Sequence, residues 1–219
     1  MALQLYAHPF SSYCQKVLIA LYENATTFEY RLVAPDDAKI MAELEVLWPF
    51  RRFPVIDDGG TAIKESSIII EYLDLHYPGT VKFIPNDAGS ALMARFMDRF
   101  FDNYVMTPMQ KIVGDSIPGR KNRDAQGVEE ARRMLDTAYR WLETNLQSRI
   151  WAAGDNFSMA DCAAAPALFY ADWAHPIDAA FTRVRAYRQR LLARASFARA
   201  VDEARPYRAF FPLGAPDRD

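Results

Sequence analysis

The run from Tyr6 to Val17 contains the residues with the clearest chemical potential in this 219-residue chain. Ser11 and Cys14 stand in the spacing S-x-x-C, where a short strand pattern gives way to a helix pattern. This is the spacing of a C-x-x-C redox pair whose attacking cysteine has been replaced by a hydroxyl. A hydroxyl at a helix N-terminus cannot exchange disulfides, but it can donate a hydrogen bond to a thiolate that a ligand brings. The motif therefore indicates a protein that binds a thiol cofactor.

Composition excludes several other classes of protein. The chain is 51% hydrophobic and 25% charged, with a net charge of −2, which is ordinary for a globular protein and does not favour nucleic acid or an anionic membrane surface as a partner. Its two cysteines, Cys14 and Cys162, are far apart, which fits a reducing compartment better than a disulfide framework. Neither a signal peptide nor a membrane span is expected, so the predicted location is cytoplasmic. The sequence has no metal-ligand spacing and no phosphate-binding glycine loop, so no metal is predicted.

Hydrophobic periodicity predicts two kinds of architecture in succession. The first part alternates strands and helices, expected at residues 3–7, 13–23, 28–33, 35–47, 53–64 and 66–77. This β-α-β-α-β-β-α order is that of a thioredoxin-like domain. Strand signals vanish after the linker, and residues 89 to about 204 read as helices throughout. We therefore predict an α/β plus all-α fold, with a thioredoxin-like domain over residues 1–78 and an all-helical domain over residues 88–219.

Four motifs, in order along both predicted domains, resemble those of the cytosolic glutathione transferases. They are the runs Ser11–Val17, Arg52–Val55, Glu65–Ser66 and Trp151–Asp161. The first is similar to the serine motif of the theta, delta and zeta classes, and the chain looks like a bacterial member. The resemblance implies glutathione as co-substrate, a small hydrophobic electrophile as second substrate, and a twofold homodimer.

The resemblance implies that Ser11 stabilises the thiolate of glutathione. Lowering a thiol pKa by two units requires about 2.7 kcal/mol of differential interaction, which a hydroxyl donor and a helix N-terminus together can supply. Two alternatives stay open for the hydroxyl that contacts sulfur. Ser12 is one, although Ser12-x-x-Gln15 also fits a capping box. Tyr6 is the other, because some classes use a tyrosine at the end of the first strand. Cys14 is expected to be buried and inert.

The second motif is expected to bind the peptide backbone of glutathione. In the family this X-Pro bond, here Phe53–Pro54, is cis. Val55 is expected to pair through its main chain with the cysteinyl unit, like an added strand. Arg52 and Lys39 are candidates to pair with the glycyl carboxylate.

The third motif is expected to bind the γ-glutamyl end. Free N–H groups at a helix N-terminus form an anion site, and the Ser66 hydroxyl adds a donor for the α-carboxylate. Glu65 is expected to face the α-ammonium group.

The second substrate is expected between the domains, against an apolar wall. The wall residues predicted from sequence are Phe10, Tyr13, Tyr104 and Trp173, with Met106, Met109 and Phe211. In the fourth motif, Ser158 and Asp161 form a predicted capping box, so Asp161 is expected to serve folding and not glutathione binding.

The leading hypothesis is a glutathione transferase. A glutathione-dependent isomerase, dehalogenase, peroxidase or disulfide reductase stays open, although Tyr13 stands where the isomerase class carries a cysteine. A non-catalytic ligand-binding protein of the same fold is the hypothesis from a different class.

Overall fold

A four-stranded sheet in the order β2-β1-β3-β4 forms the core of the first half of the protein. The computed structural model describes residues 3–147 and 149–219. The strands are β1 (Gln4–Ala7), β2 (Glu29–Leu32), β3 (Val55–Asp58) and β4 (Thr61–Lys64). β1 runs parallel to β2 and antiparallel to β3, which pairs in turn with β4. This is the predicted thioredoxin-like arrangement.

The β3–β4 hairpin turns through Gly59 and Gly60. Both have positive φ, at 59° and 96°, which a two-residue hairpin turn requires and glycine adopts without steric cost. The Asp57 carboxylate accepts a hydrogen bond of 2.9 Å from the Gly60 N–H, which fixes the turn. β4 therefore returns antiparallel along β3 directly after the turn.

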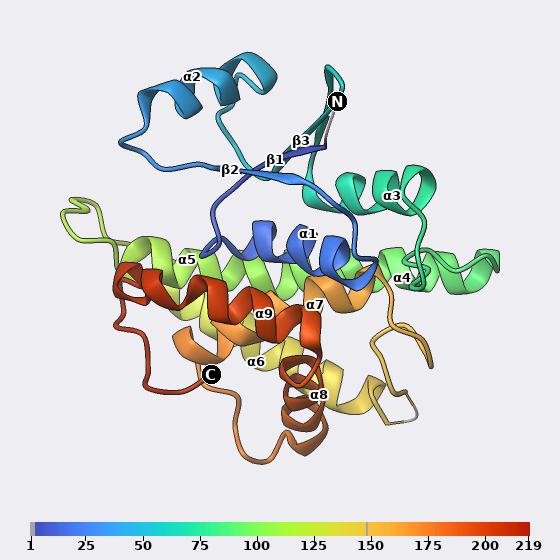
Figure 1. The fold of residues 1–219 in the computed structure, drawn as a ribbon. Helices are drawn as coiled ribbons and strands as arrows, with labels where there is room; N and C mark the ends of the chain where they lie inside the picture. The colour runs from blue at the N-terminus through green and yellow to red at the C-terminus, as the bar shows by residue number, and fades with distance from the viewer. Residues whose placement is uncertain (1–2, 148) are drawn as a thin grey trace.

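Helices cover both faces of the sheet (Figure 1). They are α1 (Ser12–Glu23), α2 (Ala38–Leu47) and α3 (Ser66–His76). Helix α2 packs over one face, where Ile40 and Leu44 contact Tyr6 and Val55. Helices α1 and α3 cover the opposite face and separate the sheet from the helical half. The N-termini of α1 and α3 thereby lie at the boundary between the halves.

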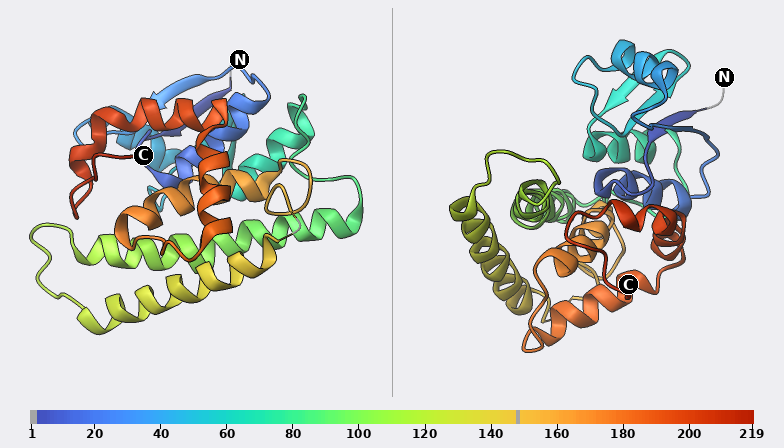
Figure 2. Two further views of the ribbon diagram at one scale, coloured as in Figure 1. Left: turned by 90° about the horizontal axis from the view of Figure 1, so that it is seen from below. Right: turned by 90° about the vertical axis from the view of Figure 1, so that its left-hand side faces the viewer.

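The second half of the chain is helical, as the sequence predicts. Its elements are α4 (Ala88–Phe100), the π-helical segment η1 (Phe101–Met106), α5 (Thr107–Asp115), α6 (Ala125–Asn145), α7 (Met159–Ala174), α8 (Thr182–Leu192), α9 (Ala195–Ala204) and the 3₁₀ segment η2 (Arg205–Phe210). Helix α9 returns beside α1, so the end of the chain meets its beginning (Figure 2).

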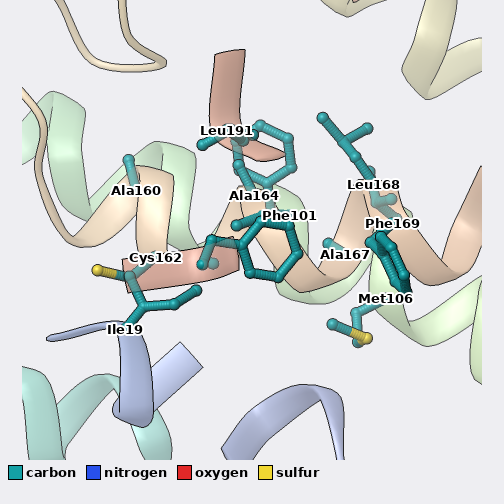
Figure 3. Close-up of a cluster of buried hydrophobic side chains, with 14 of the residues drawn as sticks. Ile19, Phe101, Met106, Ala160, Cys162, Ala164, Ala167, Leu168, Phe169 and Leu191 are labelled. Carbon is teal, nitrogen blue, oxygen red and sulfur yellow. The ribbon is translucent and has the colours of Figure 1, made fainter. Parts of the chain in front are cut away.

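Helix α7 runs through the middle of the helical half and is buried from Met159 to Trp173. A helix that is apolar on all sides must be enclosed by other elements. Figure 3 shows how α1, η1 and α8 meet around it, with Ile19, Phe101 and Leu191 directed toward Cys162 and its neighbours. One continuous core therefore joins the two halves.

The structure corrects one expectation about helix α4 and segment η1. The sequence suggests an apolar face through Leu92, Phe96, Phe100 and Tyr104, but Leu92 is 69% exposed, Phe96 46% and Tyr104 49%. The buried face instead carries Ala91, Ala94, Met97, Asp98 and Phe101; of the four expected residues only Phe100 is buried, at 7% exposed. Asp98 is tolerated there because Lys16 of α1 pairs with it, a contact that periodicity alone does not reveal.

Within residues 3–147 and 149–219, we find no helix long and apolar enough to cross a membrane.

Candidate active site

A polar cavity of about 470 Å³ opens between the sheet half and the helical half. Its walls come from the start of α1, the loop between α2 and β3, the start of α3, and the α4–α5 region. The lining residues are Ser11, Tyr13, Trp48, Arg51, Arg52, Phe53, Pro54, Glu65, Ser66, Arg99, Asp102, Asn103 and Gln110. Six of the predicted glutathione-contacting or catalytic residues thus share one cavity: Ser11, Arg52, Phe53, Pro54, Glu65 and Ser66.

Ser11 is the N-cap of α1, with extended backbone angles (φ −82°, ψ 123°). Its carbonyl accepts the first helical hydrogen bond, from Gln15 N at 2.9 Å. Its hydroxyl makes no capping hydrogen bond with the described part of the helix. The hydroxyl therefore lies at the positive end of the helix, facing a cavity and available to a ligand.

The predicted capping box at Ser12 and Gln15 is wrong. Helix α1 begins one residue earlier than expected, which makes Ser11 the cap and Ser12 the first helical residue. The Gln15 amide instead donates to the Pro9 carbonyl and to the Tyr170 hydroxyl, each at 3.0 Å. The hydrogen bond to Tyr170 joins α1 to α7. Because the buried Gln15 amide is engaged in these contacts, it does not cap its own helix. Ser12 is only 7% exposed and does not line the polar cavity.

The remaining candidate, Tyr6, and the cysteine of the motif, Cys14, both lie outside the polar cavity. The Tyr6 hydroxyl donates to the Glu43 carboxylate of α2 at 3.1 Å, and Tyr6 does not line the polar cavity. The Cys14 side chain is fully buried, and burial raises the pKa of its thiol to about 12 despite the opposing effect of the Ser11 hydroxyl. Cys14 therefore stays a neutral thiol near pH 7, in agreement with its predicted inert role.

The Phe53–Pro54 peptide bond is cis, which confirms that expectation. The predicted pairing at Val55 does not fit, because Val55 is completely buried and already pairs with Tyr6 of β1 and Lys64 of β4. Phe53 lies before the start of β3 and lines the cavity. The main chain that faces the ligand space is therefore that of Phe53 and Pro54.

Glu65 and Ser66 form the start of α3 at the cavity wall. Glu65 is the N-cap and has φ 67°, an unusual value for a residue with a β-carbon. Such strained cap positions concentrate at ligand sites. Ser66 is the first helical residue and is 6% exposed, so its hydroxyl and the free N–H groups of the first turn meet in a small space. This end of the cavity can hold a carboxylate.

The charges around the cavity include both signs. Arg51, Arg52 and Arg99 line it, whereas Lys39 on α2 is exposed and does not. The Asp102 side chain is 5% exposed, and its Oδ1 atom has no hydrogen-bond partner among the described residues. A buried acceptor without a donor is costly, so this oxygen suits a donor that a ligand supplies. The cavity therefore presents cationic side chains, acidic side chains and the Ser11 hydroxyl to a ligand.

A second cavity, of about 460 Å³, adjoins the first and is mainly apolar. Its lining is Phe10, Ser11, Ser12, Met109, Gln110, Val113, Ile117, Pro118, Tyr170, Phe210, Phe211 and Pro212. Of the predicted wall residues, Phe10, Met109 and Phe211 lie here.

The remaining predicted wall residues lie elsewhere. Tyr13 lines the polar cavity. Tyr104, Met106 and Trp173 line neither cavity, and Met106 is buried in the core. Tyr104 faces outward and packs on Phe100, while the Trp173 ring lies 5.3 Å from that of Phe211 and supports the wall from behind.

Comparison with known proteins agrees with this geometry. The family described as "Glutathione S-transferase, N-terminal domain" matches residues 5–81, and "Glutathione S-transferase, C-terminal domain" matches residues 125–190, together more than half of the chain. The chain belongs to the glutathione S-transferase family. It is similar to a probable glutathione S-transferase of Nicotiana tabacum, with 30% identity over 71% of this chain and 65% of the relative. The matched region thus spans slightly less than two thirds of that relative's length.

Two further similarities cover nearly the whole of this transferase-family chain. Glutathione S-transferase U25 of Arabidopsis thaliana is 25% identical over 92% of this chain and 90% of the relative. A Methylobacterium radiotolerans glutathione S-transferase, whose crystal structure is a complex with glutathione sulfonate, is 27% identical, with a TM-score of 0.78 over 92% of this chain and 95% of that one.

Sequence reasoning missed six residues of the polar cavity of this transferase-family chain: Trp48 and Arg51 before β3, and four from the helical half. Arg99, Asp102 and Asn103 reach the polar cavity from α4 and η1, and Gln110 reaches it from α5. No motif marks them, because their helices are placed against the first half only by tertiary packing. The one available signal was charge, because Asp98 and Asp102 are four residues apart and therefore fall on the same side of a helix.

Proposed function

We propose that this protein is a glutathione transferase that activates the thiol of glutathione at Ser11 for attack on a hydrophobic electrophile. The observation that carries the proposal is that Ser11 lines both the polar and the apolar cavity and that its hydroxyl makes no capping hydrogen bond to α1. A nucleophile held there would have its peptide in one cavity and its reaction partner in the other. Such positioning converts an encounter in solution into a reaction between adjacent groups.

The tripeptide would lie along the polar cavity with its charged ends at opposite walls. Ser66 and the first turn of α3 bind the γ-glutamyl carboxylate, while Glu65 and Asp102 face its ammonium group. The main chain at Phe53 pairs with the cysteinyl unit. Arg52, on the same side as the Phe53–Pro54 step, pairs with the glycyl carboxylate.

The Ser11 hydroxyl would then donate to the sulfur. A free thiol has a pKa of about 8.5, so only a few per cent is thiolate at pH 7. The N-terminal N–H groups of α1 and the hydroxyl both favour the anion over the thiol. A pKa lowered by about two units makes the thiolate the major form at neutral pH.

The alternatives within the family differ in the second step. The raised pKa of Cys14 disfavours a disulfide reductase that would use this cysteine.

The serine-type class, a bacterial source and a cytoplasmic location stay predictions, as does the homodimer. For the homodimer, the apolar side chains of Ile68, Leu75, Leu92 and Phe96 are exposed on α3 and α4.

The test is a comparison of wild type with Ser11→Ala and Ser12→Ala. Thiolate absorbance of bound glutathione is followed against pH, and turnover is measured with chloro-dinitrobenzene. We expect an apparent thiol pKa of about 6.5 in wild type and about 7.5 in Ser11→Ala, in which the N-terminus of α1 still favours the thiolate, with turnover near pH 6.5 falling about fivefold. Ser12→Ala should keep the wild-type pKa.

Glutathione affinity provides the control, because the peptide contacts are distant from the hydroxyl. Calorimetry should give dissociation constants for wild type and Ser11→Ala within a few-fold of each other. Failure of wild type to bind glutathione would refute the proposal. So would a thiol pKa that does not respond to Ser11→Ala. Binding without turnover on any electrophile would favour the ligand-binding alternative.

A further inference from the structure

We infer that Gln110 is a catalytic residue and that the preferred electrophiles are α,β-unsaturated carbonyl compounds with an apolar body. The inference rests on the proposed function and concerns the second substrate of the same site. The Gln110 side-chain amide would donate a hydrogen bond to the carbonyl oxygen of the electrophile while glutathione sulfur, held at Ser11, attacks the β-carbon.

The relationship between the two cavities places Gln110 at the point of reaction. Of the residues that line the polar and apolar cavities, Ser11 and Gln110 are the two that belong to both linings. Ser11 belongs to α1 in the first half and Gln110 to α5 in the second. The reacting sulfur and carbon must meet where the cavities join. Apart from Ser11, Gln110 is the residue that borders this junction from both cavities, and we therefore assign it the role of acting on the electrophile.

The helix that carries Gln110 separates polar from apolar positions at this junction. Met109 and Val113 line the apolar cavity alone, whereas Asn103 of η1 lines the polar cavity alone. The π-helical segment η1, directly before α5, adds an extra residue to the turn, a feature that recurs at functional sites. Gln110 is thus the position of α5 that faces both surfaces.

Gln110 is free to act on a ligand. It is exposed, and its side chain makes no hydrogen bond with any residue of the described ranges 3–147 and 149–219. The other large polar group of the apolar cavity is committed, because the Tyr170 hydroxyl donates to the Phe10 carbonyl at 3.2 Å and accepts from Gln15 at 3.0 Å. The amide of Gln110 is therefore the available N–H donor for an oxygen on the electrophile.

The chemistry of a neutral amide selects the class of electrophile. An amide N–H stabilises developing negative charge on oxygen but does not transfer a proton. It therefore suits a carbonyl oxygen that becomes an enolate better than an epoxide oxygen, which becomes a strongly basic alkoxide and needs an acid. A departing halide is a weaker hydrogen-bond acceptor and gains less. Apolar walls from Met109, Val113 and Phe211 suit the body of the substrate.

The reaction is a conjugate addition. The thiolate sulfur forms a bond to the β-carbon, the carbon–carbon π pair moves to form the enolate, and negative charge reaches the carbonyl oxygen at Gln110. A proton from water then bonds to the α-carbon and restores the carbonyl. Together with the proton released when glutathione ionises, the sum is one thiol and one unsaturated carbonyl giving one thioether, with no leaving group and no oxidant.

The test compares wild type with Gln110→Met, which keeps the length of the side chain and removes the donor. The matched control is Gln126→Met, an exposed glutamine at the start of α6 that lines neither cavity. Two electrophiles are used: benzylideneacetone, which is a conjugated ketone, and benzyl chloride, which has no carbonyl. Both carry a phenyl group for the apolar cavity.

For Gln110→Met we expect kcat/KM to fall about 10- to 100-fold with benzylideneacetone, mainly through kcat, because the bond strengthens in the transition state. With benzyl chloride the loss in Gln110→Met should be at least about fivefold smaller than with the ketone, whereas Gln126→Met should change kcat/KM for either substrate less than about twofold. An equal loss with both electrophiles, or none with the ketone, would overturn the role of Gln110.

A second measurement separates this inference from the function on which it rests. Wild type and Gln110→Met should bind glutathione equally and show the same lowered thiol pKa by thiolate absorbance. A wild-type protein that forms the thiolate but does not turn over benzylideneacetone overturns the substrate class and leaves the transferase proposal intact. A wild-type protein that binds no glutathione overturns both.

Discussion

The Lys16 ammonium nitrogen lies 2.6 Å from the Asp98 carboxylate, although the two side chains are only 1% and 2% exposed. Lys16 also contacts the Asp102 carboxylate and the Ser67 hydroxyl, each at 2.8 Å. Arg99 pairs with both carboxylates from the other side. Two positive and two negative charges thus balance beneath the polar cavity and join α1 and α3 to α4 and η1. This cluster fixes the position of Asp102 in the cavity wall.

Lys16→Met is expected to destabilise the protein. It leaves two buried carboxylates with one cation, and removing one partner of a buried pair costs about 3–5 kcal/mol of unfolding free energy. Urea denaturation followed by circular dichroism measures the loss. Lys39→Met, on the exposed face of α2, is the matched control and should change the unfolding free energy by less than about 0.5 kcal/mol. Adding Asp98→Asn to Lys16→Met should recover part of the loss, and a double variant no better than the single one would contradict this account.

Asp102→Asn is expected to weaken glutathione binding about tenfold at pH 7, because a charge-assisted hydrogen bond to the ammonium group is lost. Burial raises the pKa of Asp102 above its usual value, against the opposing charge of Lys16. As the pH is lowered, Asp102 in wild type therefore becomes protonated sooner than an ordinary aspartate would. The affinity for glutathione should decline over the same pH range. Calorimetry against pH measures both effects. The loss of affinity at low pH should disappear in Asp102→Asn and remain in Asp36→Asn, an exposed control. The same low-pH loss in Asp102→Asn would show that Asp102 does not bind the ammonium group.

Asp161→Ala is expected to harm folding and spare the active site. The capping box of Ser158 and Asp161 is present as predicted. The buried carboxylate also accepts from Ala152 N at 2.9 Å and from the Tyr187 hydroxyl at 2.5 Å. Its removal leaves several buried donors unsatisfied, which should lower the unfolding free energy by about 3 kcal/mol or more. The exposed Asp155→Ala is the control, and native stability with lost glutathione binding in Asp161→Ala would contradict the prediction.

Phe96→Glu is expected to convert a dimer into a monomer. Phe96 is 46% exposed on α4 beside Leu92, and a charge in an apolar interface must be desolvated without a partner. Light scattering at several protein concentrations measures the mass. Ile150→Glu, a 50% exposed apolar position remote from α3 and α4 in sequence, should stay dimeric. A wild-type mass equal to the 25.0 kDa chain would refute the expected homodimer.

Much of the fold follows from the sequence because its signals are local. Alternation over residues 3–7, the glycine pair at Gly59 and Gly60, and the helical stripe after Ser11 depend on neighbours a few residues apart. The element order and the all-helical second half are therefore predictable from periodicity and turn chemistry. The same holds for Ser158 and Asp161, because a capping box closes within one helical turn. Even the position of Ser11 before α1 is a local property.

The site required the tertiary structure because its remaining walls come from segments far apart in the chain. Asp102 and Gln110 reach Ser11 only after α4, η1 and α5 pack against α1, and no local pattern encodes that approach. The same packing turns Leu92 outward and Asp98 inward, since a buried lysine on another helix outweighs the hydrophobic pattern. Strand pairing, which is also long-range, encloses Val55 between β1 and β4. Local chemistry thus determined which groups the chain carries, and long-range burial and charge pairing decided which of them meet.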